Sequence, residues 1–290
     1  MNITPDVRQK LLAFQKNEIT EYHIYSKLAK TLKSAENQRI LENIANDERR
    51  HYEDWKRYTQ EEVPPDRWKI WRYYWISRIL GITFGIKLME NGEEGAQESY
   101  RAVQALVPEA AALQKEEHDH ENMLIDLIDE ERLRYTGSVV LGLNDALVEL
   151  TGALAGLTLA LQNTTLVALT GSITGIAAAF SMAASEYLST KSEETAKSPF
   201  KAAVYTGIAY IFTVLALILP YLIFKSLFVC LALTLVIAVM VIALFNYYFA
   251  VAKSVPFKPR FLEMTGLSLA VAALSFLIGF LMRTLFGIEV

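Results

Sequence analysis

The chain contains one cysteine, Cys230, and this residue lies within an apolar run. A single cysteine excludes an internal disulfide and any zinc or iron–sulfur site with several cysteine ligands. The N-terminus has no early apolar segment of the kind found in secretory signal peptides, so we expect the first half of the chain to stay in the cytosol. That half also lacks strand-like alternation of apolar and polar residues, which leaves helical patterns as its main feature.

Charge is scarce in the second half. Of the 60 charged residues (28 Lys and Arg, 32 Asp and Glu), only 15 lie in 137–290, and all four histidines lie in the first half. Hydrophobic residues make up 52% of the chain, which is high for a soluble protein. We therefore predict a water-exposed domain over 1–135 and a membrane domain over 136–290. We expect no nucleic-acid partner.

Five apolar runs follow Gly137, and each is long enough to cross a hydrocarbon core of about 30 Å. They cover roughly 138–161, 165–188, 202–224, 227–250 and 262–285. The fold class predicted for the whole chain is all-α. It comprises a helical bundle followed by five transmembrane helices.

Positive charges near the ends of these runs predict the orientation. Five spans place the two termini on opposite sides. Eight Lys and Arg residues lie on the N-terminal side and two lie on the other side, so we expect the N-terminal domain in the cytosol. The C-terminus would then lie on the opposite side of the cell membrane. The eight are Arg132, Arg134, Lys191, Lys197, Lys201, Lys253, Lys258 and Arg260, and the two are Lys225 and Arg283.

The first two runs contain carboxylates, which are costly in lipid, and a methionine whose sulfur can bind a metal ion. Asp145 and Glu149 lie in the first run, and Met182 and Glu186 lie in the second. Asp145 and Met182 lie at similar depths, ~12 Å from the same side at 1.5 Å per residue, so we expect them to meet. Carboxylate and thioether ligands together suit a divalent transition metal. Carboxylates within a membrane span usually line a polar pathway. Alternatives are that Met182 fills a packing gap and that Glu186 is an interfacial charge.

Small residues recur at a spacing that favours close helix packing. Gly152 and Gly156 form G-x-x-x-G in the first run, and Gly171 and Gly175 do so in the second. Such pairs allow two helix backbones to approach closely in a membrane. We therefore expect both runs to have tightly packed neighbours.

The first half reads as four helices, over about 4–32, 35–62, a third ending near 105, and about 108–134. The second and fourth carry Glu48-x-x-His51 and Glu117-x-x-His120, and residues three apart share one face of a helix. A Glu from each of two helices plus Glu-x-x-His from each of two others is the di-iron or di-manganese carboxylate arrangement. The predicted metal ligands are Glu18, Glu48, His51, Glu90, Glu93, Glu117 and His120, with Glu94 as an alternative to Glu90. We expect Glu21 to be a supporting or surface group.

The segment 66–89 is rich in aromatic and cationic residues. Trp68, Trp71 and Trp75 recur at i, i+3 and i+7, interleaved with Lys and Arg. This mixture is typical of a helix at the membrane interface, and our hypothesis is that the segment rests on the bilayer. The alternative is packing within the bundle or across a dimer.

Two families share these motifs. Residues 1–134 resemble the rubrerythrin branch of the ferritin-like superfamily through the Glu-x-x-His pairs and their partner glutamates. Residues 137–290 resemble the vacuolar iron transporter family through Gly142-Leu-Asn-Asp-Ala-Leu-Val and Ser181-Met-Ala-Ala-Ser-Glu-Tyr. The fused order is similar to the membrane-bound ferritin type of iron exporter.

The resemblance implies a homodimeric, proton-coupled exporter of Fe²⁺, with Mn²⁺ as the second candidate. It also implies a di-iron centre, or alternatively manganese, at the ligands named above. The cysteine-rich rubredoxin module of rubrerythrins is absent, since Cys230 stands alone. Electron transfer to peroxide by that route is therefore not expected.

A competing hypothesis makes the N-terminal domain a ferroxidase or peroxidase that five spans merely anchor. The sequence leaves enzymatic activity open and assigns no catalytic residue. An anchor has no need of carboxylates within its spans, which favours transport.

Overall fold

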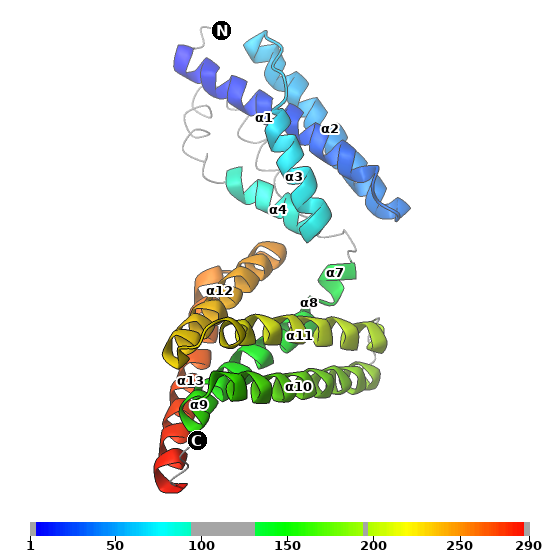
Figure 1. Ribbon diagram of the computed structural model, residues 1–290. Helices are drawn as coiled ribbons and strands as arrows, with labels where there is room; N and C mark the ends of the chain where they lie inside the picture. Colours follow the sequence, from blue (N-terminus) through cyan, green and yellow to red (C-terminus); the bar gives the residue numbers. More distant parts are fainter. Residues whose placement is uncertain (1–3, 94–130, 194–196, 287–290) are drawn as a thin grey trace. The chain divides into compact units, whose positions relative to one another are not determined.

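The computed structural model describes residues 4–93, 131–193 and 197–286, and every regular element in these ranges is a helix (Figure 1). The chain divides into two compact units, residues 1–131 and 132–290. Each is described here by itself.

Four helices make up the described part of the first unit. They are α1 (Pro5–Ala29), α2 (Ala35–Thr59), α3 (Arg67–Leu80) and α4 (Ile82–Glu93). The predicted first and second helices are confirmed. Pro5 begins α1 at a position where a backbone N–H would have no partner within the helix, so its missing N–H costs nothing. At the start of α2, the Ser34 side chain accepts a hydrogen bond from the Asn37 N–H.

The aromatic and cationic segment 66–89 forms α3 and most of α4, which runs on to Glu93. The rest of the predicted third helix lies outside the described residues. Asp66 caps α3, and Gly81 adopts φ 113°, a conformation that glycine reaches readily, so the chain turns into α4. The two helices approach closely, because a Cβ at Gly85 of α4 would meet the Ser77 hydroxyl of α3. The predicted fourth helix lies outside the described residues except for α7 (Glu131–Arg134).

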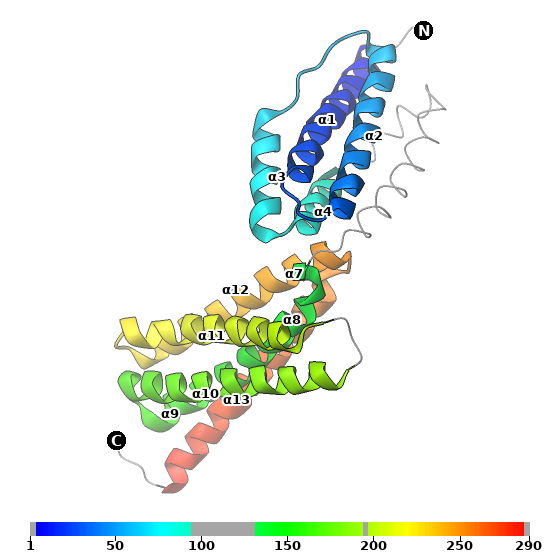
Figure 2. The ribbon, with the colours of Figure 1, turned by 90° about the vertical axis from the view of Figure 1, so that its right-hand side faces the viewer.

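A core joins all four helices of the first unit, which Figure 2 shows side by side. Tyr25 and Leu28 of α1 and Leu41 of α2 are fully buried in it, and Ile86 and Met89 of α4 are 1% exposed. Tyr73 and Ile70 contribute the inner face of α3. Burial of each such side chain stabilises the fold by roughly 1.5–3 kcal/mol.

The described residues of the second unit form five helical spans long and apolar enough to cross a membrane. The first span, Thr136–Leu161, consists of α8 (Thr136–Asp145), a π-helical turn at Ala146–Leu150 and α9 (Thr151–Leu161). The others are α10 (Thr164–Ser192), α11 (Pro199–Ile223), α12 (Leu227–Lys253) and α13 (Phe257–Phe286). The five predicted spans are confirmed.

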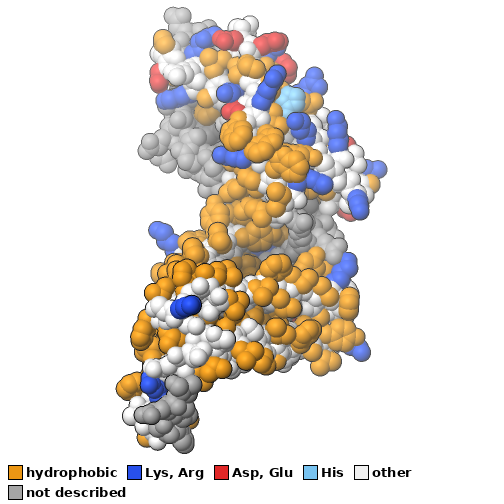
Figure 3. Space-filling model, in the orientation of Figure 1, with side chains coloured by type: hydrophobic (Ala, Val, Ile, Leu, Met, Phe, Trp, Pro, Cys, Tyr) orange, Lys and Arg blue, Asp and Glu red, His pale blue; other side chains and the backbone are white. Residues whose placement is uncertain are grey.

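The surface of the second unit is that of a protein surrounded by lipid. Hydrophobic side chains dominate its visible face, with scattered Lys and Arg (Figure 3). Phe212 on α11 and Leu244 on α12 are 69% and 72% exposed. Such exposed apolar side chains are stable in a membrane, because lipid tails are as apolar as the side chains themselves.

The predicted close packing occurs at both glycine pairs. A Cβ at Gly156 would lie 2.9 Å from the Ser275 carbonyl oxygen, so α9 packs directly against α13. A Cβ at Gly175 would lie 2.8 Å from Val214, so α10 packs equally closely against α11. These contacts fix the first two spans against the third and fifth.

Candidate metal sites

Three metal-binding side chains converge between α1 and α2. Ligand atoms of Glu18, Glu48 and His51 all lie within 4.8 Å of one another. The His51 Nδ1 atom is 3.6 Å from a Glu18 oxygen and 3.9 Å from a Glu48 oxygen. Among the described residues this is the one group of three or more His, Cys, Asp or Glu ligands at such spacing.

Local helix geometry produces this convergence. Glu48 and His51 are three residues apart on α2, so both project toward α1, where Glu18 faces them. Trp55, one turn further along α2, donates its indole N–H to Glu18 at 3.0 Å. The Trp55 ring packs against Phe14 of α1, with ring centroids 5.8 Å apart. An apolar wall therefore holds the donor that orients the Glu18 carboxylate.

The electrostatics of the site favour a bound cation. Glu48 is 4% exposed and His51 is 7% exposed, so both are shielded from water. Burial by itself raises the pKa of Glu18, but hydrogen bonds involving Glu48, His51 and Trp55 outweigh burial and lower that pKa. The lowered pKa favours the charged form of Glu18, and a cation bound at its oxygens would be stabilised by that charge.

The three residues fit one transition-metal ion. Carboxylate oxygens and an imidazole nitrogen are ligands that iron and manganese accept, and the Trp55 hydrogen bond is the kind of support that orients a metal-binding carboxylate. The other predicted ligands lie beyond what the structure describes. Glu117 and His120 lie outside the described residues, and so does Glu94, while Glu90 and Glu93 belong to α4 but their side chains are not described. The two-metal centre stays a prediction.

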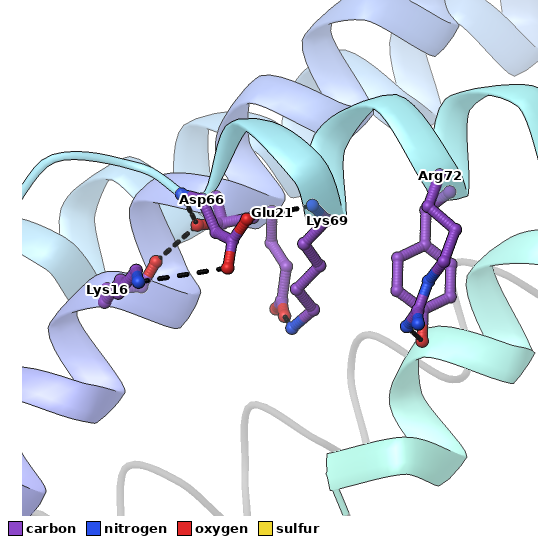
Figure 4. Close-up of polar contacts among 7 residues, drawn as sticks. Lys16, Glu21, Asp66, Lys69 and Arg72 are labelled. Carbon is purple, nitrogen blue, oxygen red and sulfur yellow. Dashed lines mark hydrogen bonds and ion pairs between the residues drawn. The ribbon is translucent and has the colours of Figure 1, made fainter.

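Glu21 has a structural partner rather than a place among the three ligands. It is 4% exposed, and the Lys69 ammonium of α3 lies 3.2 Å from its carboxylate. In Figure 4 this ion pair lies beside Asp66, whose backbone N–H donates to the Thr20 hydroxyl of α1. The sequence placed Glu21 among supporting or surface groups, and its contact with Lys69 ties α3 to α1.

A second polar group lies within the membrane unit. Glu149 accepts a hydrogen bond from the Tyr210 hydroxyl of α11 at 3.4 Å. Asp145 also interacts with both Glu149 and Tyr210. Tyr210 is fully buried. Two carboxylates of the first span and a hydroxyl of the third therefore share one polar spot.

The π-helical turn begins directly after Asp145 and contains Glu149. A π-turn displaces the regular hydrogen-bond pattern of a helix and is frequent at functional sites. The Ser268 hydroxyl of α13 donates to the Leu147 carbonyl oxygen at 2.8 Å, which satisfies an acceptor inside the turn. The interruption is therefore supported by a neighbouring helix and both carboxylates sit at it.

Glu186 and Met182 have different surroundings. Glu186 accepts hydrogen bonds from the Ser138 hydroxyl of α8 at 2.6 Å and from Thr190 at 3.5 Å. Met182 packs against the buried cluster that includes Ala146 and Leu147 of the first span. The first and second spans do meet at this level, although Glu186 does not join Asp145 and Glu149 in a three-ligand group among the described residues.

Two of these contact residues were not predicted from the sequence. Tyr210 lies 61 residues after Glu149 and belongs to no motif that we could identify. Ser138 is an ordinary small residue of a membrane helix. The sequence shows only that Tyr210 and Ser138 carry a hydroxyl group within an apolar run. This does not indicate which residue each hydroxyl contacts.

Comparison with protein families identifies a similarity in the membrane unit. The model of the VIT family, the vacuolar iron transporter family named above, matches residues 136–197. No curated protein and no solved structure matches the chain. The matched stretch covers the first two spans and contains Asp145, Glu149, Met182 and Glu186. With its five apolar helices, the chain is a multi-pass membrane protein whose first two spans are similar to the VIT family.

Proposed function

We propose that this protein transports a divalent transition metal across the membrane, with Fe²⁺ as the favoured substrate and Mn²⁺ as the second candidate. The similarity of residues 136–197 to the VIT family supports transport of iron or manganese. The observation that carries the proposal is the carboxylate pair Asp145 and Glu149 at a π-helical turn, facing Tyr210. A membrane anchor gains nothing from two carboxylates in this position.

The proposed pathway uses four side chains of the first two spans. Metal would meet Glu186 first, then Asp145 and Met182, and finally Glu149. Carboxylates must release protons to bind a metal ion, so metal entry at Asp145 and Glu149 expels protons and metal departure takes them up. This exchange gives a physical basis for coupling transport to a proton gradient.

The first unit would supply metal to this pathway. Glu18, Glu48 and His51 would hold the ion, and the unit would capture, sense or oxidise it. The excess of Lys and Arg on the N-terminal side of the spans supports a cytosolic first unit and hence export from the cytosol. A homodimer is part of the proposal through the family resemblance.

Replacement of Asp145 by Asn tests the pathway. The amide keeps the shape of the side chain but removes the charge and the exchangeable proton. We expect metal flux into proteoliposomes to fall at least about tenfold in Asp145→Asn, a loss of about 1.4 kcal/mol in stabilisation of the moving ion.

Glu193→Gln is the matched control, because Glu193 is an exposed carboxylate just beyond the end of α10. We expect its flux to equal that of the wild type. Normal flux in a folded Asp145→Asn protein would count against the pathway.

The second candidate function is an anchored di-iron ferroxidase or peroxidase without transport. The observation that favours it is the buried group Glu18, Glu48 and His51, which can hold iron without any help from the membrane unit. Oxidation of Fe²⁺ that depends on Glu48, with no flux in the same preparation, would support this function.

A further inference from the structure

The outer face of α3 presents large aromatic and aliphatic side chains. Trp68, Trp71 and Trp75 are 66%, 54% and 47% exposed, and Ile79 is 64% exposed. Their spacing of three and four residues places them on one side of the helix. Contiguous exposed apolar residues of this size mark an interaction surface.

The rest of α3 is firmly fixed, so this exposure is built into the fold. Ile70, Tyr73 and Ser77 bury the inner face. The Asp66 side chain accepts hydrogen bonds from the backbone amides of Trp68 and Lys69 in the first turn of α3. The Lys69 ammonium pairs with the buried carboxylate of Glu21 (Figure 4). Trp68 and Trp71 stack on each other with centroids 4.9 Å apart. The outward rings are therefore held in place.

The charge of this helix has one sign. Between Arg67 and Leu80 there are four cationic residues and no acidic one. Arg67, Arg72 and Arg78 are exposed, and within the described ranges Arg67 and Arg78 take part in no ion pair. Figure 3 shows Lys and Arg side chains on both sides of the hydrophobic group.

A groove runs beside the same aromatic residues. Its volume is about 630 Å³, and His23 and Lys27 of α1 and Arg67, Trp71 and Trp75 of α3 contribute to its lining. Burial first, and then Lys27, lower the pKa of His23, so His23 is neutral at neutral pH and the positive charge at the groove comes from Lys27 and Arg67. A negatively charged group with apolar surroundings fits this lining.

We propose that the α3 surface, defined as Trp68, Trp71, Trp75 and Ile79 with Arg67, Arg72 and Arg78, binds the headgroup region of an anionic lipid bilayer. Tryptophan prefers this region because its ring is apolar and its N–H is polar, and arginine is attracted to anionic headgroups there. A second copy of this chain fits poorly, because a symmetric contact through α3 would place arginines against arginines.

The distribution of tryptophan makes the proposal directly measurable in the full-length protein. The chain has four tryptophans, and all lie in the first unit. Three belong to the α3 surface, whereas Trp55 is 6% exposed. The experiment places one copy of the protein in each lipid nanodisc and measures tryptophan quenching by lipids that carry a nitroxide near the headgroup. We expect more than about half of the emission to be lost in discs containing phosphatidylglycerol.

Variants assign the quenching to the surface. In the triple variant Trp68→Phe, Trp71→Phe and Trp75→Phe, the remaining Trp55 emission should be unaffected by the lipid nitroxide. Replacing Arg67, Arg72 and Arg78 by Gln should weaken quenching in phosphatidylglycerol discs. Replacing Arg39, Arg50 and Arg57 of α2 by Gln removes the same charge from another face and should leave quenching unchanged.

Three results would overturn the proposal. The first is wild-type emission that the lipid nitroxide leaves intact, while aqueous iodide quenches it down to the Trp55 emission of the triple variant. The second is equal quenching in discs of phosphatidylglycerol and of phosphatidylcholine, with no effect of the arginine replacements. The third is shielding from iodide that grows with protein concentration in detergent without lipid, which would indicate a contact between copies.

Discussion

Glu48 is a buried carboxylate on α2, and the carboxylate of Glu18 on α1 lies close to it. Two such groups repel each other unless a proton or a cation lies between them. His51 lies within reach of both carboxylates, and the Trp55 indole donates a hydrogen bond to Glu18. If this group holds the proposed metal ion, the cation would relieve the repulsion between the two carboxylates.

The first prediction concerns Glu48→Gln, which removes one charged ligand and keeps the side-chain shape. Affinity of the first unit for Mn²⁺ should fall at least about tenfold, or about 1.4 kcal/mol. Thermal stability without metal should be unchanged or higher, because the carboxylate repulsion is relieved. Anaerobic titration calorimetry on the full-length protein measures the affinity.

Glu42→Gln is the control for that variant, since Glu42 is an exposed carboxylate of the same helix that accepts a hydrogen bond from Gln38. It should bind metal as the wild type does. Unchanged metal affinity and stoichiometry in Glu48→Gln would show that Glu18, Glu48 and His51 do not form a metal site.

At the scale of residues, contacts between side chains of one helix could be predicted from the sequence better than contacts between side chains of different helices. Glu48 and His51 were predictable because an i, i+3 pair shares a helix face regardless of the rest of the fold. Glu18 followed from the resemblance to a known ligand pattern. Tyr210 could not be predicted, because its contact with Glu149 depends on how α11 packs against the first span.

Among the elements, α3 depends on a cap that titrates. The Asp66 side chain accepts hydrogen bonds from the Trp68 and Lys69 amides, each at 3.0 Å. The Lys69 amide is the main cause of the lowered pKa of Asp66, and Lys16 adds to it. A group whose pKa is lower in the folded state stabilises the fold above its unfolded pKa, and this stabilisation is lost as pH falls through the folded pKa.

The second prediction is that Asp66→Ala lowers the free energy of unfolding of the first unit by about 1 kcal/mol at neutral pH. The difference from the wild type should shrink as pH falls below the ordinary aspartate range, about pH 4. Tryptophan emission during denaturant unfolding reports on this unit, because all four tryptophans lie there. Asp66→Asn keeps a side-chain oxygen that accepts these hydrogen bonds, so it should lose less stability. A loss of unfolding free energy in Asp66→Ala that grows toward low pH would contradict the role of the carboxylate.

The contact between α9 and α13 also involves Gly279 of α13, which belongs to neither G-x-x-x-G pair. A Cβ at Gly279 would meet the Gly156 carbonyl oxygen, whereas a Cβ at Gly266 of the same helix would meet nothing within 4 Å. We predict that Gly279→Ala destabilises the membrane unit by about 1–3 kcal/mol, because backbone atoms cannot move aside easily. Gly266→Ala should be neutral. Thermal unfolding in detergent, followed by circular dichroism, distinguishes the two, and equal melting temperatures would show that the helices adjust freely.

The five spans were predictable because apolar runs of sufficient length are hard to place anywhere but in a membrane. Their ends were less so, since α10 runs on to Ser192 and α13 already begins at Phe257. Two local features were not predictable. The π-helical turn at Ala146–Leu150 accepts a hydrogen bond from the Ser268 hydroxyl of α13. The break between α3 and α4 falls at Gly81, whose φ is 113°. Both are set by contacts or backbone angles that periodicity does not contain.

At the scale of the whole molecule, chemistry that suits metal ions occurs in both units. The first holds a carboxylate and imidazole set between two helices, and the second holds carboxylates within an apolar helical unit. The charge distribution along the sequence predicted this division, since only 15 of the 60 charged residues lie in 137–290. Each unit has its own set of side chains that could bind a metal ion, so transport and anchored iron oxidation predict different results for variants of the two sets.

The measurement that tests the central claim most directly is metal flux in proteoliposomes containing the wild-type protein, with and without an imposed pH gradient. Transport predicts that Fe²⁺ or Mn²⁺ crosses the bilayer, that the pH gradient drives it, and that empty liposomes show no such flux. Folded wild-type protein that moves neither metal, while oxidising Fe²⁺ in a manner that Glu48→Gln abolishes, would contradict transport and leave an anchored iron enzyme.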